Sequence, residues 1–170
     1  NFEFHVKRLR PMAEILGDCQ CVFGLEFVAP KTLRINHKYE FIHTMEGILK
    51  LCEAIGTGNL GLLLDCWHWY TSHGTLDQLR RLRGRQVIYV HVNDAPPEIP
   101  IDEQIDNVRR LPGETGVIDI VSFLRTLREI GYDGPVTPEP FEKKLKEIPI
   151  EEAVRKVGEA LDHVWQLAGL

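Results

Sequence analysis

Four short, mostly apolar segments of the sequence each lead into an ionisable side chain. The segments are residues 21–25, 60–64, 87–90 and 135–138, and the residues that follow them are Glu26, Asp65, His91 and Glu139. Amphipathic helical patterns separate the segments along the chain. Nearly continuous apolar strands that alternate with helices are typical of a parallel sheet covered by helices. The pattern therefore predicts an α/β fold with about four strand–helix units.

Local signals mark where several of the helices begin and end. Thr44 and Asp119 are suitable N-cap residues, and Gly56 and Gly131 stand where a helix favours a left-handed C-terminal residue. Pro11 is expected to kink the first helix. The predicted helices are residues 2–16, 44–55, 76–83, 119–130 and 150–167.

The position and type of the strand-end residues favour a β/α barrel over a doubly wound sheet. In a barrel the C-terminal strand ends meet at one mouth, where active sites are built. All four residues are of metal-ligand types, three carboxylates and one imidazole. Such a set suits one divalent cation, namely Mn²⁺, Co²⁺, Mg²⁺ or Zn²⁺. Each residue taken singly is also explained as the polar exit of a strand, and only the whole set indicates a site.

The overall composition narrows the classes of function. With 20 Lys and Arg against 25 Asp and Glu, the net charge is −5, which disfavours nucleic-acid binding. No apolar run approaches the roughly 20 residues of a membrane-spanning helix. The four cysteines include no C-x-x-C pair, and a chain of 170 residues builds its core without disulfides. We therefore expect reduced thiols in a cytoplasmic protein whose partner is a small molecule.

The sequence around the strand ends resembles a known family. His68 stands three residues after Asp65, and Asp94 stands three residues after His91. The segments concerned are Gly24–Glu26, Leu64–His68, Val90–Asp94 and Thr137–Phe141. In this order they resemble the C-terminal half of the xylose isomerase-like TIM barrel superfamily, the group of sugar phosphate isomerases and epimerases.

The resemblance implies a partial barrel. A complete barrel has eight strands in about 250 residues, whereas this chain supplies four. We therefore expect residues 1–170 to form a single xylose isomerase-like TIM-barrel domain that lacks its N-terminal half. Either the chain is a fragment of a longer protein, or its two open sheet edges pair with another chain. The fragment is favoured, and a homo-oligomer stays open.

The resemblance also implies a reaction. Glu26, Asp65, His91 and Glu139 are expected to hold the metal ion, which would polarise the carbonyl of a sugar, sugar phosphate or polyol ketone. Glu26 and Glu139 are expected to be the catalytic bases that remove the neighbouring proton and return it to the enediolate. The implied activity is that of a metal-dependent isomerase or epimerase of carbohydrate metabolism.

Four further residues are candidates for supporting roles. His68 is expected to hydrogen-bond a substrate hydroxyl or a bound water, and Trp67 and Phe141 are expected to line a sugar pocket. Asp94 is expected to orient His91. A structural role is the alternative for each: packing for His68 and the aromatic residues, and a turn for Asp94.

One departure from the relatives concerns phosphate binding. Several ketose epimerases of the superfamily carry an Arg soon after the strand-end His, but here no Lys or Arg occurs between Val92 and Val108, where the chain is acidic. This argues against a phosphate held at that place, although Arg109, Arg110 and residues 143–144 could bind one from elsewhere. Free sugars or inositol-like polyol ketones are favoured as substrates.

Three other functions are weighed against the isomerase. A single-metal dehydratase or hydrolase of a sugar-like ketone begins with the same proton abstraction. An AP endonuclease-like phosphodiesterase needs an Asp-x-His after the strand-end His, and the chain has no His between His91 and His163. A non-catalytic barrel module would keep the fold without the chemistry, and the intact set of ligand-type residues speaks against it.

Overall fold

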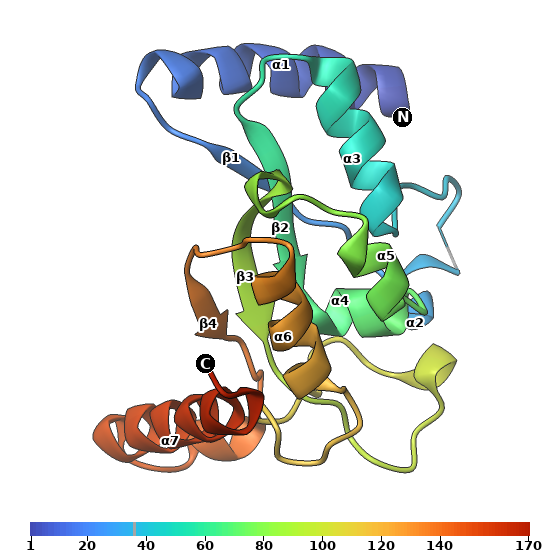
Figure 1. The fold of residues 1–170 in the computed structure, drawn as a ribbon. Coiled ribbons are helices and arrows are strands. Elements are labelled where there is room, and N and C mark those ends of the chain that lie inside the picture. The colour runs from blue at the N-terminus through green and yellow to red at the C-terminus, as the bar shows by residue number, and fades with distance from the viewer. Residues whose placement is uncertain (36) are drawn as a thin grey trace.

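The fold is built on a parallel sheet of four strands. The structure is a computed structural model that describes residues 1–35 and 37–170. The sheet has the order β1-β2-β3-β4 (Figure 1). The strands are β1 (Phe23–Leu25), β2 (Leu60–Asp65), β3 (Val87–Val92) and β4 (Val136–Pro138). Each new strand joins the sheet on the same side of the preceding one, whereas a doubly wound sheet reverses its strand order at a switch point. This order agrees with the predicted partial barrel.

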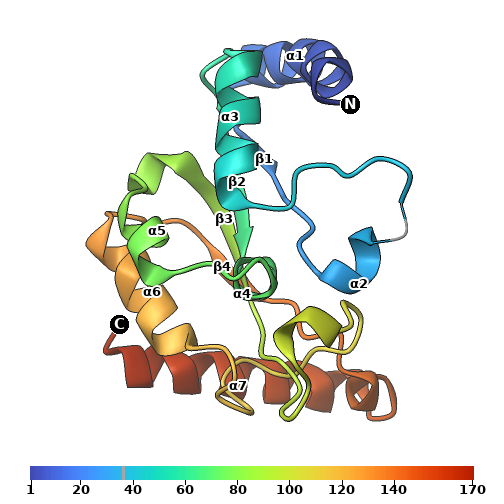
Figure 2. The same cartoon turned by 90° about the vertical axis from the view of Figure 1, so that its right-hand side faces the viewer.

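Helices connect the strands and cover the sheet. The α-helices are α1 (Phe2–Asp18), α2 (Lys31–Arg34), α3 (Met45–Ile55), α4 (Cys66–Thr71), α5 (Leu76–Arg80), α6 (Ile120–Glu129) and α7 (Ile150–Ala168). The 3₁₀ helices are η1 (Gly84–Gln86), η2 (Ile101–Glu103) and η3 (Lys143–Lys146). Helix α3 packs on β2, and α6 packs on both α5 and α7. Figure 2 shows α5 and α6 on one side of the sheet. Among the described helices, none combines the length and the apolar character needed to cross a membrane.

Several predicted helix ends are confirmed, because they depend on local chemistry. The Thr44 side chain accepts a hydrogen bond from the Gly47 N–H and begins α3, and Gly56 ends it with a φ of 74°. The Asp119 side chain caps α6 in the same way. Helix α1 continues through Pro11 as one helix, and α5 ends at Arg80, earlier than predicted.

The sequence patterns did not predict α4. This six-residue helix follows β2 directly, because the Asp65 carboxylate accepts a hydrogen bond from the Trp67 N–H and caps the helix. A helix of less than two turns shows no apolar period along the sequence. Its effect is to place His68 one turn beyond Asp65.

The core lies on the helix-covered face of the sheet. Leu62, Leu64, Val90 and Val92 are fully buried in one cluster with α6. Since alternate residues of a strand face opposite sides, Asp65 and His91 belong to the opposite face. They are direct register partners across β2 and β3. The topology therefore gathers the ionisable strand ends on the side that is free of core packing.

Candidate metal centre

The structure brings the four predicted strand-end side chains into one region. Two groups of potential ligand atoms each lie within 4.8 Å of one another, and both groups contain Asp65. One group is Glu26, Asp65 and His68, and the other is Asp65, His91 and Glu139. The Glu139 N–H donates to the Val92 carbonyl at 3.0 Å, which fixes Glu139 beside β3. Parallel pairing thus makes the site from residues that are far apart in the sequence.

Asp65 is the fixed centre of this region. Its side chain has no exposed surface. Oδ1 accepts hydrogen bonds from the Trp67 N–H at 2.8 Å and from Asn93 Nδ2 at 2.9 Å. Oδ2 accepts one from Arg109 Nη1 at 2.6 Å. A buried carboxylate with three donors is held rigidly, because its oxygens are satisfied by hydrogen bonds.

Arg109 lies at the centre of the site, although it belongs to a distant loop. Its Nη1 donates to Asp65 and also to Glu139 Oε2 at 2.9 Å, and its Nη2 donates to Asp106 Oδ1 at 2.9 Å. The guanidinium lies over the Trp67 ring at 5.2 Å and over the Phe141 ring at 4.6 Å. Arg109 is 1% exposed. The structure thus buries one cation among the carboxylates of the predicted metal site.

A backbone pairing explains how Arg109 reaches the site. The Asp94 N–H donates to the Arg110 carbonyl at 3.0 Å, and the Arg110 N–H donates back to the Asp94 carbonyl at 2.8 Å. This antiparallel bridge closes the loop that leaves β3. It returns Arg109 to the strand ends.

The donor set fits a divalent cation. Three carboxylates and one imidazole are the ligand types of Zn²⁺ and Mn²⁺ sites. Within residues 1–35 and 37–170, His91 Nδ1 is buried without a hydrogen-bond partner, and it lies 3.4 Å from Glu139 Oε2. Buried polar atoms in proteins normally have a hydrogen-bond partner. This ring nitrogen therefore has a donor or acceptor position that a bound ligand would satisfy. The Arg109 guanidinium between Asp65 and Glu139 shows that these oxygens attract positive charge.

Burial and mutual repulsion perturb the carboxylates. Burial, followed by the charges of Asp65 and Glu139, raises the pKa of Glu26 to about 7. Burial also raises the pKa of Glu139, while the nearby His91 and Arg109 act to lower it. Such shifts are characteristic of active sites because charges are concentrated there away from water.

His68 is a neutral imidazole with a defined tautomer. Burial lowers the pKa of His68 to about 4. Its Nδ1 accepts a hydrogen bond from the Ala29 N–H at 3.3 Å, so the proton resides on Nε2. Nε2 lies 3.9 Å from Glu26 Oε1. The N–H of His68 therefore faces the carboxylate and the space around it.

The structure places the predicted supporting residues Trp67, Phe141 and Asp94 in three different environments. Trp67 is 0% exposed and its ring lies against the Arg109 guanidinium, and its contact with a substrate stays a prediction. Phe141 is 46% exposed and covers the other side of Arg109, which leaves part of its ring open. The Asp94 carboxylate accepts hydrogen bonds from the backbone N–H groups of Ala95, Thr115, Gly116 and Ile118. Asp94 therefore shapes a turn, and its expected role in orienting His91 stays a prediction.

Two site residues were missed by the sequence analysis. Asn93 donates to Asp65, and Arg109 was considered only as a possible phosphate ligand. Asn93 lies two residues beyond His91, and a strand-end amide gives no signal distinct from that of a loop residue. Arg109 carried a weak signal, because it is the first basic residue after a long acidic loop.

Comparison with known proteins agrees with this geometry. The inosose isomerase of Halalkalibacterium halodurans is 29% identical over 150 residues, which are 88% of this chain and 50% of that protein. The 3-dehydroshikimate dehydratase of Pseudomonas aeruginosa is 29% identical over 129 residues, 73% of this chain and 20% of that protein. The chain spans about half the length of the inosose isomerase relatives it matches. By their names, these relatives are an isomerase of inosose and a dehydratase of 3-dehydroshikimate.

Solved structures share the fold. A xylose isomerase domain protein from Alicyclobacillus acidocaldarius matches with a TM-score of 0.82 at 36% identity, over 96% of this chain and 57% of that one. The IolI protein, solved with a bound zinc atom, matches with a TM-score of 0.82 at 25% identity, over 96% of this chain and 55% of that one. The sequence profile described as xylose isomerase-like TIM barrel matches residues 2–164. With its strand order, its strand-end carboxylates and this match, the chain belongs to the xylose isomerase-like TIM barrel family.

Proposed function

We propose that this chain takes part in the metal-dependent isomerisation or epimerisation of a sugar, sugar phosphate or polyol ketone. The observation that carries the proposal is the placement of two glutamates, Glu26 and Glu139, on either side of the buried Asp65. Two carboxylates that flank one point can remove a proton from one position of a substrate and return it at another. The relatives named inosose isomerase support a polyol ketone as substrate.

Glu26, Asp65, His91 and Glu139 would hold one divalent ion. A bound ion would supply Lewis acidity, which polarises a substrate carbonyl and makes the neighbouring C–H more acidic. Zinc is favoured by the zinc-bound structural relative, and Mn²⁺, Co²⁺ and Mg²⁺ suit the same oxygen-rich ligand set.

The side chains of the site have separate roles in proton transfer and in positioning. Glu26 and Glu139 accept and return the proton, and the Nε2–H of His68 orients Glu26 or a substrate hydroxyl. Arg109 donates to the carboxylates of Asp65 and Glu139, so its guanidinium holds these oxygens in position. The four cysteines are free thiols, which fits the proposed cytoplasmic location.

The test is exchange of the substrate's α-proton with solvent. The protein would be incubated in D₂O with a metal ion and a panel of ketoses and inososes, and deuterium uptake followed by NMR. Glu26→Gln and Glu139→Gln should each slow exchange by roughly 10²- to 10⁴-fold, since each removes a general base. Glu103→Gln, an exposed carboxylate of η2, is the matched control and should exchange as the unchanged protein does. Full exchange in either site variant would contradict the assignment.

A dehydratase is the second candidate, supported by the 3-dehydroshikimate dehydratase relatives. Its reaction begins with the same proton abstraction and continues with loss of a hydroxide as water. The same NMR experiment distinguishes the two, because a dehydratase yields an unsaturated product and an epimerase does not. Metal analysis separates both from a non-catalytic module, which would hold no tightly bound ion.

A further inference from the structure

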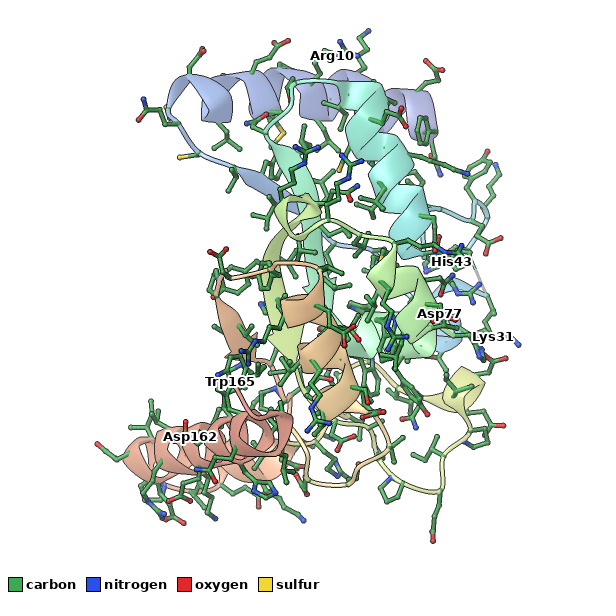
Figure 3. All side chains as sticks on the ribbon, in the orientation of Figure 1. Arg10, Lys31, His43, Asp77, Asp162 and Trp165 are labelled. Atoms are coloured by element: carbon green, nitrogen blue, oxygen red, sulfur yellow. The ribbon has the colours of Figure 1, made fainter. Side chains whose placement is uncertain are left out.

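A cavity of about 370 Å³ adjoins the candidate site. Glu26 is one of its lining residues, and the others come from the segment between β1 and α3 and from the first turn of α3. Figure 3 places His43, another lining residue, on the side of the molecule that carries α2. A cavity of this size is typical of sites for small organic groups. Because it shares Glu26 with the site, a substrate held there could extend into it.

The wall of this cavity is mainly apolar and partly open to solvent. Val28 is 47% exposed, Leu33 is 43% exposed and Tyr39 is 65% exposed. Phe41, Ile42 and Ile48 complete the apolar wall. Exposed apolar side chains gathered around a hollow are typical of ligand-binding grooves and other interaction sites. Their position beside Glu26 points to a part of the substrate as the ligand.

The one arginine of the cavity lining is already paired. Arg34 Nε donates to the Ala29 carbonyl at 3.0 Å, and Arg34 Nη1 donates to Glu40 Oε1 at 3.1 Å. His43 Nδ1 lies 3.2 Å from the Phe41 carbonyl. Among the lining residues that the structure describes, Arg34 is the single Arg or Lys side chain, and Glu40 offsets its charge. The cavity therefore offers a phosphate little attraction.

We propose that this cavity binds an apolar, ring-sized substituent carried by the hydroxy-ketone substrate, in preference to a phosphate. The inference rests on the proposed function, since it places the reacting part of the substrate at Glu26. The aromatic ring of Tyr39 and the branched side chains of Val28 and Leu33 would cover the substituent. Burial of such a group gives specificity of roughly 10- to 200-fold over a substrate that lacks it.

The experiment compares three probes: an inosose, its monophosphate and its O-phenyl ether. The expected kcat/KM for α-proton exchange is about 10-fold or more higher for the phenyl ether than for the inosose. Leu33→Ser should bring the ratio of the two values close to one. Ile35→Ser is the matched control, since Ile35 is 60% exposed on the same segment and does not line the cavity, and it should keep the ratio.

The outcomes separate this inference from the proposed function. Three outcomes would overturn the cavity assignment and leave the reaction intact. They are exchange with no preference for the phenyl ether, a preference for the monophosphate, and equal ratios in the two Ser variants. Loss of exchange with every probe would overturn the reaction. In that case ligand-observed NMR with the phenyl ether still tests the cavity: weaker binding by Leu33→Ser than by Ile35→Ser supports it, and equal binding overturns it.

Discussion

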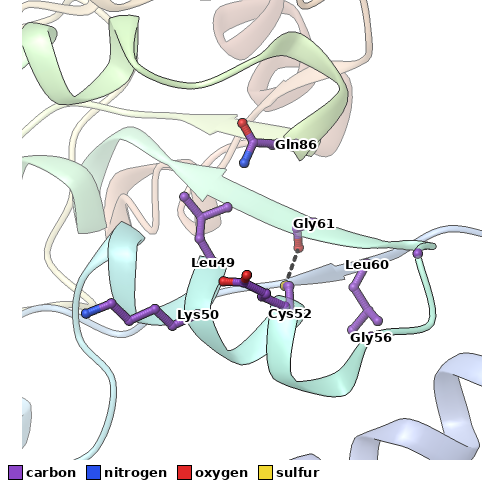
Figure 4. Close-up of a pocket in the computed structure, with 9 residues that line it drawn as sticks. Leu49, Lys50, Cys52, Gly56, Leu60, Gly61 and Gln86 are labelled. Carbon is purple, nitrogen blue, oxygen red and sulfur yellow. Dashed lines mark hydrogen bonds between the residues drawn. The ribbon is translucent and has the colours of Figure 1, made fainter.

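The two ends of the parallel sheet differ in what they bury. At the amino ends of β2 and β3 a cavity of about 540 Å³ is lined by Cys52, Gly61 and Gln86, among others (Figure 4). It is larger than the cavity beside Glu26, yet its charged lining residues, Lys50 and Glu53, are exposed. At the carboxyl ends the carboxylate of Asp65 and the guanidinium of Arg109 are almost completely buried. Buried charge therefore identifies the site better than the volume of a hollow does.

The physical reason is the cost of removing a charge from water. A buried ion that lacks a partner is strongly unfavourable, so a fold retains such groups only where partners or ligands satisfy them. The amino-end cavity leaves its ions in solvent and needs no such compensation. The carboxyl-end site combines Asp65, Glu139 and Arg109 in one hydrogen-bonded network.

Loss of a ligand at the carboxyl end should have the largest effect. Asp65→Asn removes one carboxylate charge from the site, and Zn²⁺ affinity measured by calorimetry should fall by roughly 100-fold or more. Loss of a residue that only hydrogen-bonds a metal ligand lowers affinity by about 10- to 100-fold, and loss of a ligand itself should cost more. Glu53→Gln makes the same chemical change at the amino end and should bind Zn²⁺ as the unchanged protein does. Equal affinities for the two variants would remove the distinction between the ends.

Arg109 offers a sharper test of the buried charges. In metal-free protein, Arg109→Leu leaves the buried Asp65 without its cation and should lower the free energy of unfolding by about 3–5 kcal/mol. The exposed pair of Arg155 and Glu159 is the control, and Arg155→Leu should cost about 1 kcal/mol or less. Urea titration measures both.

Added Zn²⁺ extends the Arg109 experiment. The ion would provide the carboxylates with another cation, so the deficit of Arg109→Leu should shrink when the metal is present. A deficit that is unchanged by Zn²⁺ would mean that metal and guanidinium do not share the oxygens of Asp65 and Glu139.

Gly61 tests the packing at the amino end. A Cβ at this position would lie 2.6 Å from the Gln86 carbonyl oxygen, so Gly61→Ala should destabilise the protein by about 1–3 kcal/mol. Gly158 is exposed in α7 with open space around it, and Gly158→Ala should instead stabilise by about 0.5–1 kcal/mol. Neither change should alter Zn²⁺ affinity; a clear loss of affinity in Gly61→Ala would show that the two ends are coupled.

The thiols should give the smallest and most local difference. Burial raises the pKa of Cys52 to about 11 and raises the pKa of Cys66 well above its usual range. The thiolate is the reactive form, so iodoacetamide at pH 8 should modify the exposed Cys19 and Cys21 first. Labelling of Cys52 should accelerate as the pH rises toward 11, and Cys66 should react after unfolding. Rapid labelling of Cys52 at pH 8, read by peptide mass spectrometry, would contradict its assigned environment.

The predictions that were confirmed depend on short stretches of sequence. Thr44 and Gly56 define α3 because capping and left-handed geometry involve only neighbouring residues. Helix α4 was not predicted, because its N-cap is Asp65, a residue that the sequence pattern assigns to a strand end. The expectation that residues 1–170 lack the first half of a barrel stays a prediction, as do the roles of the four ligand-type residues.

The sequence indicates a barrel-like sheet with carboxylates and an imidazole at the C-terminal strand ends. Two features are enough for this: the apolar runs that alternate with helices, and the rule that parallel strands end at one edge of the sheet. The sequence by itself determined this because strand direction and side-chain type are fixed residue by residue. Only the tertiary structure decided that Arg109 enters the site, that Trp67 lies beneath it, and that Asp94 shapes a turn. These outcomes depend on how a long loop closes and on which charges must be buried together, and no linear pattern encodes either.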